Sequence, residues 1–210
     1  LAGRHALSAK DFDTAATYLS RVIKDDLANP ELLNGLISVQ VSLGNIAAAK
    51  HSADKLDLIN VQTQLSNMVK VATQLHARDY GKAKRQINND QGINPLLDKI
   101  VIGWALAEEG NFEDAKLIFD DIGEGSSLAQ FSQMQKASML AAYGRYQSAL
   151  STIDNLEMSS SRLSVDARVM KVQLLLKLNK TDEAAEYFSK FFGEGAGSDA
   201  LTLRSQIEKH

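Results

Sequence analysis

The sequence predicts an all-α protein in which one pair of helices is repeated about six times. Alanine recurs every 32 to 35 residues, and each alanine closes a similar phrase, such as GNFEDA or GRYQSA. The two prolines, at Asn29-Pro30 and Asn94-Pro95, lie about two periods apart in the same frame. A fixed period in this range indicates stacked copies of one supersecondary unit. The alanines, called anchors below, are Ala15, Ala49, Ala83, Ala115, Ala149 and Ala184.

The first helices of two repeats are expected to begin at an asparagine cap, at Asn29 and Asn94, and first helices are expected to cross their partners closely. Asparagine caps a helix N-terminus well, and proline suits the first turn, as at Asn29-Pro30. Twelve residues before the anchors stand small or β-branched residues, including Gly103 and Ala137. Such side chains let two helix backbones approach, so a bulky replacement should overpack the crossing.

A turn and a second helix complete the repeat. Five residues before the anchors stand three glycines and an asparagine, which suit the left-handed turn that ends a helix. The anchor and the positions four and seven residues later share one helical face, and most are apolar. Three residues depart from the pattern. Gln40 and Gln74 replace large apolar residues, and Asp90 interrupts the stripe of the third repeat, where we expect a local kink.

This pattern resembles the tetratricopeptide repeat (TPR) family. The best matches are GWALAEEGNFEDAKLIFDDI at 103–122 and ASMLAAYGRYQSALSTIDNL at 137–156. The resemblance implies a right-handed α/α superhelix of about six TPR units in one domain over 1–210, from a bacterial TPR protein or a fragment of one. The expected repeats are 1–28, 29–61, 62–93, 94–127, 128–161 and 162–195. A further helix at 198–209 is expected to be a cap or half of a seventh repeat.

Composition excludes several classes of function. The chain has 23 basic and 26 acidic side chains, a net charge of −3, so nucleic acid is not the expected partner. It has no cysteine, which excludes disulfides and thiolate chemistry. The longest apolar run, 100–107, is too short to span a bilayer. Because the chain opens with Leu1 inside a helical pattern, we expect it to be a piece of a longer protein.

No catalytic or metal-binding pattern is present in the sequence. The histidines His5, His51, His76 and His210 fall in different repeats without metal-ligand spacing. The glycine-rich segments at 123–127 and 193–198 lack the lysine and spacing of a phosphate-binding loop. We therefore expect neither enzymatic activity nor a cofactor.

The expected function is binding of another protein. In the TPR family the first helices line a concave groove, and the resemblance places apolar residues there in the third to fifth repeats. Exposed apolar patches of this kind mark binding sites, although superhelix curvature or the C-terminal helix would instead bury them as core. The groove hypothesis rests on seven residues, Leu65, Met68, Leu97, Ile100, Trp104, Phe131 and Met134.

Other assignments remain open at this point. Basic residues gather at 82–85 and acidic residues at 108–124, which fits either a solvated outer face with weak ion pairs or electrostatic steering of a partner. Alternative functions are self-association as a homo-oligomer and regulation of a larger protein. Similarity to exported bacterial repeat proteins favours a periplasmic over a cytoplasmic location.

Overall fold

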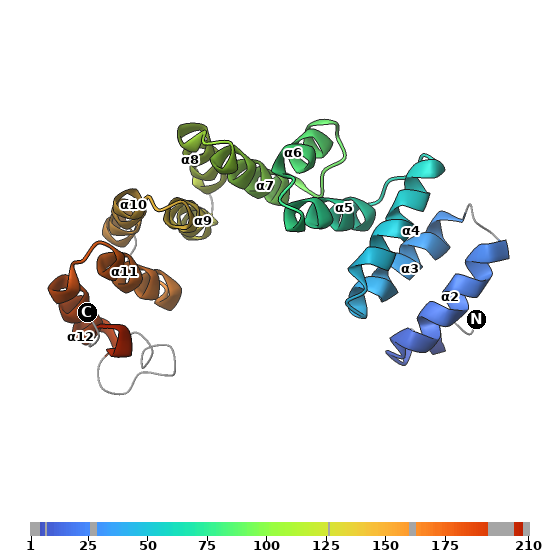
Figure 1. The fold of residues 1–210 in the computed structure, drawn as a ribbon, viewed down its shortest axis with the longest axis horizontal. Helices are drawn as coiled ribbons and strands as arrows, with labels where there is room; N and C mark the ends of the chain where they lie inside the picture. The colour runs from blue at the N-terminus through green and yellow to red at the C-terminus, as the bar shows by residue number, and fades with distance from the viewer. Residues whose placement is uncertain are drawn as a thin grey trace. The chain divides into compact units, whose positions relative to one another are not determined.

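The computed structural model describes residues 5–6, 8–25, 29–125, 127–159, 163–192 and 204–207. All bounded elements in these ranges are helices, which confirms the all-α prediction (Figure 1). They are α2 (Phe12–Asp25), α3 (Pro30–Ser42), α4 (Ile46–Leu58), α5 (Gln64–His76), α6 (Tyr80–Asn88), α7 (Pro95–Glu108), α8 (Phe112–Gly123), α9 (Ala129–Ala142), α10 (Tyr146–Ser159), α11 (Val165–Lys177) and α12 (Thr181–Phe192).

The chain divides into two compact units, Leu1–Val101 and Ile102–His210, called the N-terminal and C-terminal units below. The division falls inside α7. In the N-terminal unit α2 packs on α3, α3 on α4, α4 on α5 and α5 on α6. In the C-terminal unit α8 packs on α9, α9 on α10, α10 on α11 and α11 on α12. Within α2–α6 and within α8–α12, each helix thus contacts its neighbours in sequence, as expected for stacked repeats. The single domain and its repeat boundaries stay a prediction.

The anchors lie where paired helices cross. None of the six alanine side chains has any exposed surface. The opposing positions, twelve residues earlier, are also buried where the structure describes them, as at Ile37, Val71 and Ala137. Apolar side chains around these crossings form the core of each unit. In the N-terminal unit this core is continuous from α2 to α5 and includes Leu33 and Leu56.

Left-handed residues end the first helices, as the glycine pattern predicts. All six positions five residues before an anchor have positive φ: Lys10, Gly44, Arg78, Gly110, Gly144 and Asn179. Glycine and asparagine tolerate this conformation well, whereas Lys10 and Arg78 adopt it at a steric cost. The register of the repeat therefore imposes the turn even where the residue type does not favour it.

The caps also follow the sequence. Asn29 Oδ1 accepts a hydrogen bond from Leu32 N at 3.2 Å, and Asn94 Oδ1 accepts one from Leu97 N at 3.0 Å. Both prolines lie in the first turn of their helices, α3 and α7. Each cap satisfies a backbone donor that a helix N-terminus would otherwise leave unpaired.

Asp90 changes the third repeat by ending its second helix early. The residue has a φ of 60°, and α6 stops at Asn88 after only 9 residues. The loop that follows is held by side chains rather than by a longer helix. Asn67 Nδ2 donates to Gly92 O at 2.9 Å, and Asp98 Oδ1 accepts from Ile93 N at 2.7 Å.

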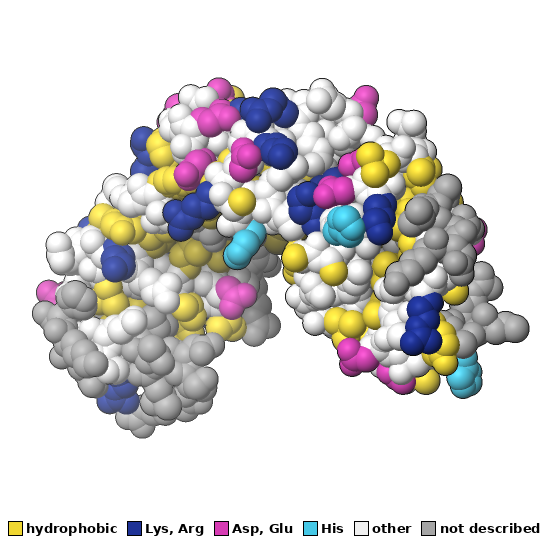
Figure 2. All heavy atoms as spheres, turned by 45° about the vertical axis from the view of Figure 1, so that its right-hand side comes forward, with side chains coloured by type: hydrophobic (Ala, Val, Ile, Leu, Met, Phe, Trp, Pro, Cys, Tyr) yellow, Lys and Arg dark blue, Asp and Glu magenta, His cyan; other side chains and the backbone are white. Residues whose placement is uncertain are grey.

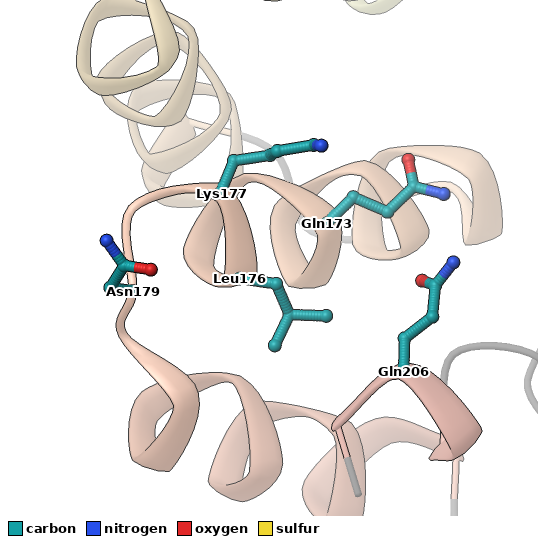
Figure 3. Close-up of a pocket in the computed structure, with 5 residues that line it drawn as sticks. All are labelled: Gln173, Leu176, Lys177, Asn179 and Gln206. Atoms are coloured by element: carbon teal, nitrogen blue, oxygen red, sulfur yellow. The ribbon is translucent and has the colours of Figure 1, made fainter. Parts of the chain in front are cut away.

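The predicted helix at 198–209 lies mostly outside the described residues. Within it the structure describes 204–207, which are helical. Gln206 from this segment approaches Gln173 and Leu176 of α11 (Figure 3).

Glycine at the α7–α8 crossing yields a stability prediction. A Cβ at Gly103 would lie 2.8 Å from Phe119 Cζ, whereas a Cβ at Gly35 in α3 would meet nothing closer than 3.9 Å. We expect Gly103→Ala to lower the free energy of unfolding by about 1–3 kcal/mol through overpacking. Gly35→Ala should raise it by about 0.5–1 kcal/mol, since alanine is the better helix former. Urea denaturation measures both, and shifts of the same sign would contradict the prediction.

Candidate functional site

The seven residues of the groove hypothesis are divided between the two units. The N-terminal unit holds Leu65 and Met68 on α5, and Leu97 and Ile100 on α7; the C-terminal unit holds Trp104 on α7, and Phe131 and Met134 on α9. Met68, Leu97 and Phe131 are exposed, at 37%, 38% and 41%. The other four are half-buried. None is fully buried, but Leu65 packs against the core of the N-terminal unit. The groove itself stays a prediction.

Phe119 fixes the first-helix face of the C-terminal unit. Its ring is fully buried in α8 and lies against Gly103 of α7. Its carbonyl accepts a hydrogen bond from the hydroxyl of Ser132 in α9. Trp104 and Phe131 directly adjoin these two contact residues in sequence. Because successive residues of a helix point about 100° apart, both large side chains are directed away from the contact with α8.

Polar and aromatic contacts at the end of α7 add rigidity to this face. The Tyr143 hydroxyl donates to the Glu108 carboxylate. The Tyr143 ring meets Phe112 edge-on, with centroids 5.5 Å apart. The Arg145 guanidinium lies 3.8 Å from the centroid of the Phe112 ring. Helices α7, α8 and α9 are thus tied together at one end by contacts with defined geometry.

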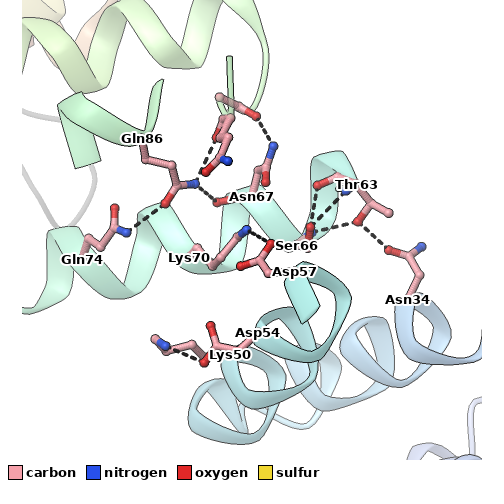
Figure 4. Close-up of polar contacts among 12 residues, drawn as sticks. Asn34, Lys50, Asp54, Asp57, Thr63, Ser66, Asn67, Lys70, Gln74 and Gln86 are labelled. Carbon is pink, nitrogen blue, oxygen red and sulfur yellow. Dashed lines mark hydrogen bonds and ion pairs between the residues drawn. The ribbon is translucent and has the colours of Figure 1, made fainter. Parts of the chain in front are cut away.

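In the N-terminal unit a polar network positions α5, which carries Leu65 and Met68 (Figure 4). Thr63 and Ser66 form a reciprocal capping box at the start of the helix. The Thr63 hydroxyl also donates to Asn34 Oδ1 of α3 at 2.8 Å. The start of α5 is therefore fixed to the preceding repeat.

Gln40 and Gln74, the two departures from the family pattern, link the two helices of their repeats. Gln40 Oε1 accepts from the Ser52 hydroxyl at 2.9 Å. Gln74 Nε2 donates to Gln86 Oε1 at 2.8 Å. In both repeats the partner of the glutamine stands twelve residues later, on the second helix. A hydrogen bond between the two helices therefore takes the place of the apolar contact that the family pattern predicts there.

Three lysines join successive repeats and were not anticipated from the sequence. Lys70, Lys136 and Lys171, called the inter-repeat lysines below, each stand thirteen residues before an anchor. Each forms an ion pair with a carboxylate on the second helix of the preceding repeat. The pairs are Lys70 with Asp57 at 2.8 Å, Lys136 with Asp120 at 2.8 Å, and Lys171 with Asp154 and Glu157 at 2.7 Å each.

The inter-repeat lysines are buried along their stems and paired at their tips. The Lys70 side chain is 8% exposed, whereas that of Asp57 is 43% exposed. Burying the alkyl chain while the ammonium reaches a carboxylate near solvent avoids an isolated buried charge. The sequence does carry a signal for these pairs, because the carboxylates recur five or eight residues after an anchor. Finding it requires comparing neighbouring repeats rather than single ones.

The most extensive of these pairs connects the fifth and sixth repeats. Burial opposes ionisation of Glu157, but hydrogen bonds from Lys171 and Tyr187 outweigh it and lower the pKa of the carboxyl. For Lys171, burial is likewise outweighed by hydrogen bonds to Asp154 and Glu157, which raise its pKa. The Tyr187 hydroxyl donates to Glu157 at 2.9 Å, and burial together with this bond raises the pKa of the phenol.

Comparison with known proteins identifies the architecture. Residues 1–52 match the family Tetratricopeptide repeat, and no curated protein matches the chain. A tetratricopeptide repeat protein from Parabacteroides merdae has a similar structure, with a TM-score of 0.69 at 18% identity over 99% of this chain and 83% of that one. The fold is a tetratricopeptide-repeat solenoid. PilW, a type IV pilus biogenesis factor, matches this TPR fold with a TM-score of 0.67 at 13% identity, over 96% of this chain and 94% of its own.

A third TPR structure is also similar. YrrB, described as a TPR protein with an unusual peptide-binding site, matches with a TM-score of 0.55 at 14% identity. The match covers 93% of this chain and 98% of YrrB. At these identities the structural matches establish the fold, and function has to be argued from this chain's own residues.

The described part of this chain contains no group of three or more histidine, aspartate or glutamate side chains placed to hold a metal ion. Its described helices include none that is both long and apolar enough to cross a membrane. A cavity of about 410 Å³ beside α11 is lined mainly by amides and Leu176 (Figure 3). On the face drawn in Figure 2, acidic and basic side chains are interspersed.

The lowered pKa of Glu157 predicts how the stability of the protein changes with pH. A carboxyl with a lowered pKa stabilises the fold above its unfolded pKa, and this contribution is lost as the pH falls through the folded value. We expect Glu157→Gln to lower the melting temperature by about 2–4 °C near pH 6 and to reduce the loss of stability between about pH 6 and pH 3. Calorimetry across this range measures both effects.

Glu186→Gln is the matched control for this measurement. Glu186 is an exposed carboxylate on α12, so its substitution removes one negative charge without breaking the contacts of Glu157 with Lys171 and Tyr187. If the melting temperature of Glu157→Gln changed with pH in parallel with that of the wild type, Glu157 would not have the lowered pKa on which the prediction rests.

Proposed function

We propose that this TPR chain is a protein-interaction module that binds an apolar peptide or helix on its first-helix faces and carries out no catalysis. The observation that supports it most is the exposure of Phe131, together with half-buried Trp104 and Met134 on the same face. Exposed aromatic and methionine side chains beside a rigid core suit adaptable apolar contacts. The N-terminal unit offers a second apolar face, aliphatic rather than aromatic, through Met68 and Leu97.

Two further features favour binding over a purely structural role. Phe119, Ser132 and Gly103 hold α7 and α9 rigidly against α8, so the face is preorganised and loses little entropy on binding. In addition, YrrB, which has a similar fold, is a TPR protein with a peptide-binding site. The face on this chain would supply the apolar contacts, and the partner would supply side chains that fill the spaces around Phe131.

Peptide selection tests this proposal directly. Peptides selected from a random displayed library against the whole chain should carry apolar residues at helical spacing. We expect Phe131→Ala and Trp104→Ala each to weaken a selected peptide by about tenfold or more, as for residues at the centre of an interface. Isothermal titration calorimetry measures binding for every variant, including Trp104→Ala, which lacks the single tryptophan of the chain.

Met158→Ala is the matched control. Like Phe131, Met158 is apolar and exposed, at 78%, but it lies on α10, which is the second helix of its repeat. It should bind the selected peptide as the wild type does. Thermal melting of each variant separates binding from folding. If Phe131→Ala melts far below the wild type while the folded fraction still binds normally, Phe131 is core and the proposal fails.

A further inference from the structure

A segment of the chain itself lies against the first helix of the sixth repeat. Residues 204–207, which are helical and are called the 204–207 segment below, approach α11 through Gln206 (Figure 3). Gln206 shares a cavity with Gln173 and Leu176, which stand eleven and eight residues before the anchor of their repeat. Trp104 holds the first of these positions in the fourth repeat. The chain therefore supplies an occupant at a position equivalent to one that the groove hypothesis assigns to a partner.

The packing between the 204–207 segment and α11 is loose. A cavity of about 410 Å³ opens between Gln206 and α11. Ser205 and Ile207 are only half-buried, and Arg204 and Gln206 are exposed. Packed helices normally leave few voids larger than a water molecule, and each unfilled volume forfeits van der Waals contact. The apolar packing that holds the segment is therefore weaker than that of the permanent helix pairs, whose anchors have no exposed surface.

The amides that line the cavity do not tie the segment to α11. In Figure 3 the Gln206 side chain extends from the segment toward α11, and Leu176 extends from α11 into the space beside it. Among the described residues, no hydrogen bond joins the Gln173 and Gln206 amides. Both amides can therefore bond water or the polar groups of another helix at this place.

We propose that the α11 surface around Gln173 and Leu176 is a helix-binding site that the 204–207 segment occupies reversibly, as an intramolecular ligand. A helix of a partner protein that fills the cavity better displaces the segment. Such a helix needs an apolar side chain to cover Leu176 and an amide or hydroxyl to bond the Gln173 amide. Because the segment belongs to the same chain, its high effective concentration keeps weak competitors out. The inference adds a surface to the proposed function without depending on Trp104 or Phe131.

A peptide with the chain's own C-terminal sequence tests the site in the intact protein. The probe is a fluorescent peptide of residues 198–210, titrated against the full chain by fluorescence anisotropy. In the wild type the attached segment competes, so we expect the peptide to bind weakly. Ile207→Asp in the protein should release the attached segment, because a carboxylate disfavours a half-buried position. This variant should bind the peptide about tenfold more tightly, or better.

A crosslink provides the opposite perturbation. The chain has no cysteine, so Gln173→Cys combined with Gln206→Cys introduces a single pair of thiols. A short crosslinker with a cleavable disulfide should join these thiols within one chain. In the Ile207→Asp background the crosslink should return peptide binding to the wild-type level, and reductive cleavage should restore the tighter binding.

Matched variants control for the added charge and for the added thiol. Leu117 is an apolar side chain of the same unit and is 65% exposed on α8, so Leu117→Asp should leave peptide binding at the wild-type level. Gln206→Cys alone should form no crosslink within the chain. Phe131→Ala added to Ile207→Asp should keep the tighter binding, so failure of this site and failure of the proposed function are distinguishable.

Any of three results would overturn the proposal. The first is an Ile207→Asp variant that melts like the wild type and binds the peptide no better than Leu117→Asp does. The second is a melting temperature of Ile207→Asp lower by more than about 10 °C, which would make the 204–207 segment a permanent part of the core. The third is a crosslink that joins two chains, which would assign the segment to the α11 surface of a second copy.

Discussion

The close crossing of paired helices at the anchor alanines is the constraint on which the rest of the structure depends. All six alanine side chains lack exposed surface, so a larger side chain at any of them would have to fit inside the packed core. Four residues after the anchor, the side chain is buried in five repeats and half-buried in the third. Seven residues after it, Leu56, Ile122 and Leu156 are buried, whereas Val22 and Asp90 are exposed. The same crossing also determines which side chains of the first helices face away from the core. Phe131 and Met68 are two of them. The same geometry that stabilises the fold therefore selects which residues can contact a partner.

Polar contacts supplement apolar packing both within repeats and between successive repeats. Gln40 and Gln74 hydrogen-bond within their repeats, and the inter-repeat lysines connect one repeat to the next. Ion pairs of this kind add little net stability, since desolvation offsets much of the attraction. They do impose geometry, because a buried lysine stem tolerates only arrangements in which its ammonium reaches a carboxylate. Polar groups here restrict how neighbouring repeats can be placed, while apolar burial supplies the stability.

Features local to one repeat could be predicted from the sequence. The anchors, the asparagine caps and the turn positions each depend on residues within one period. Register even predicts the left-handed conformation of Lys10 and Arg78, whose side chains disfavour it. Features that depend on two repeats escaped prediction. The partner of Lys136 lies sixteen residues away in another repeat, and the exposure of Leu117 depends on which helices cover it. Asp90 could be recognised as an irregularity, but its role in ending α6 required the backbone angle.

The inter-repeat lysines have a consequence for the modularity of the array. Each lysine belongs to one repeat and its carboxylate to the repeat before it, so neither repeat holds a complete pair. The equivalent positions in the second and fourth repeats are Leu36 and Ile102, which need no such partner. A repeat with the lysine, moved behind a neighbour without the carboxylate, would bury an uncompensated charge. The helix pairs are thus not interchangeable, and part of their order along the chain is encoded in the pairing of charges across their boundaries.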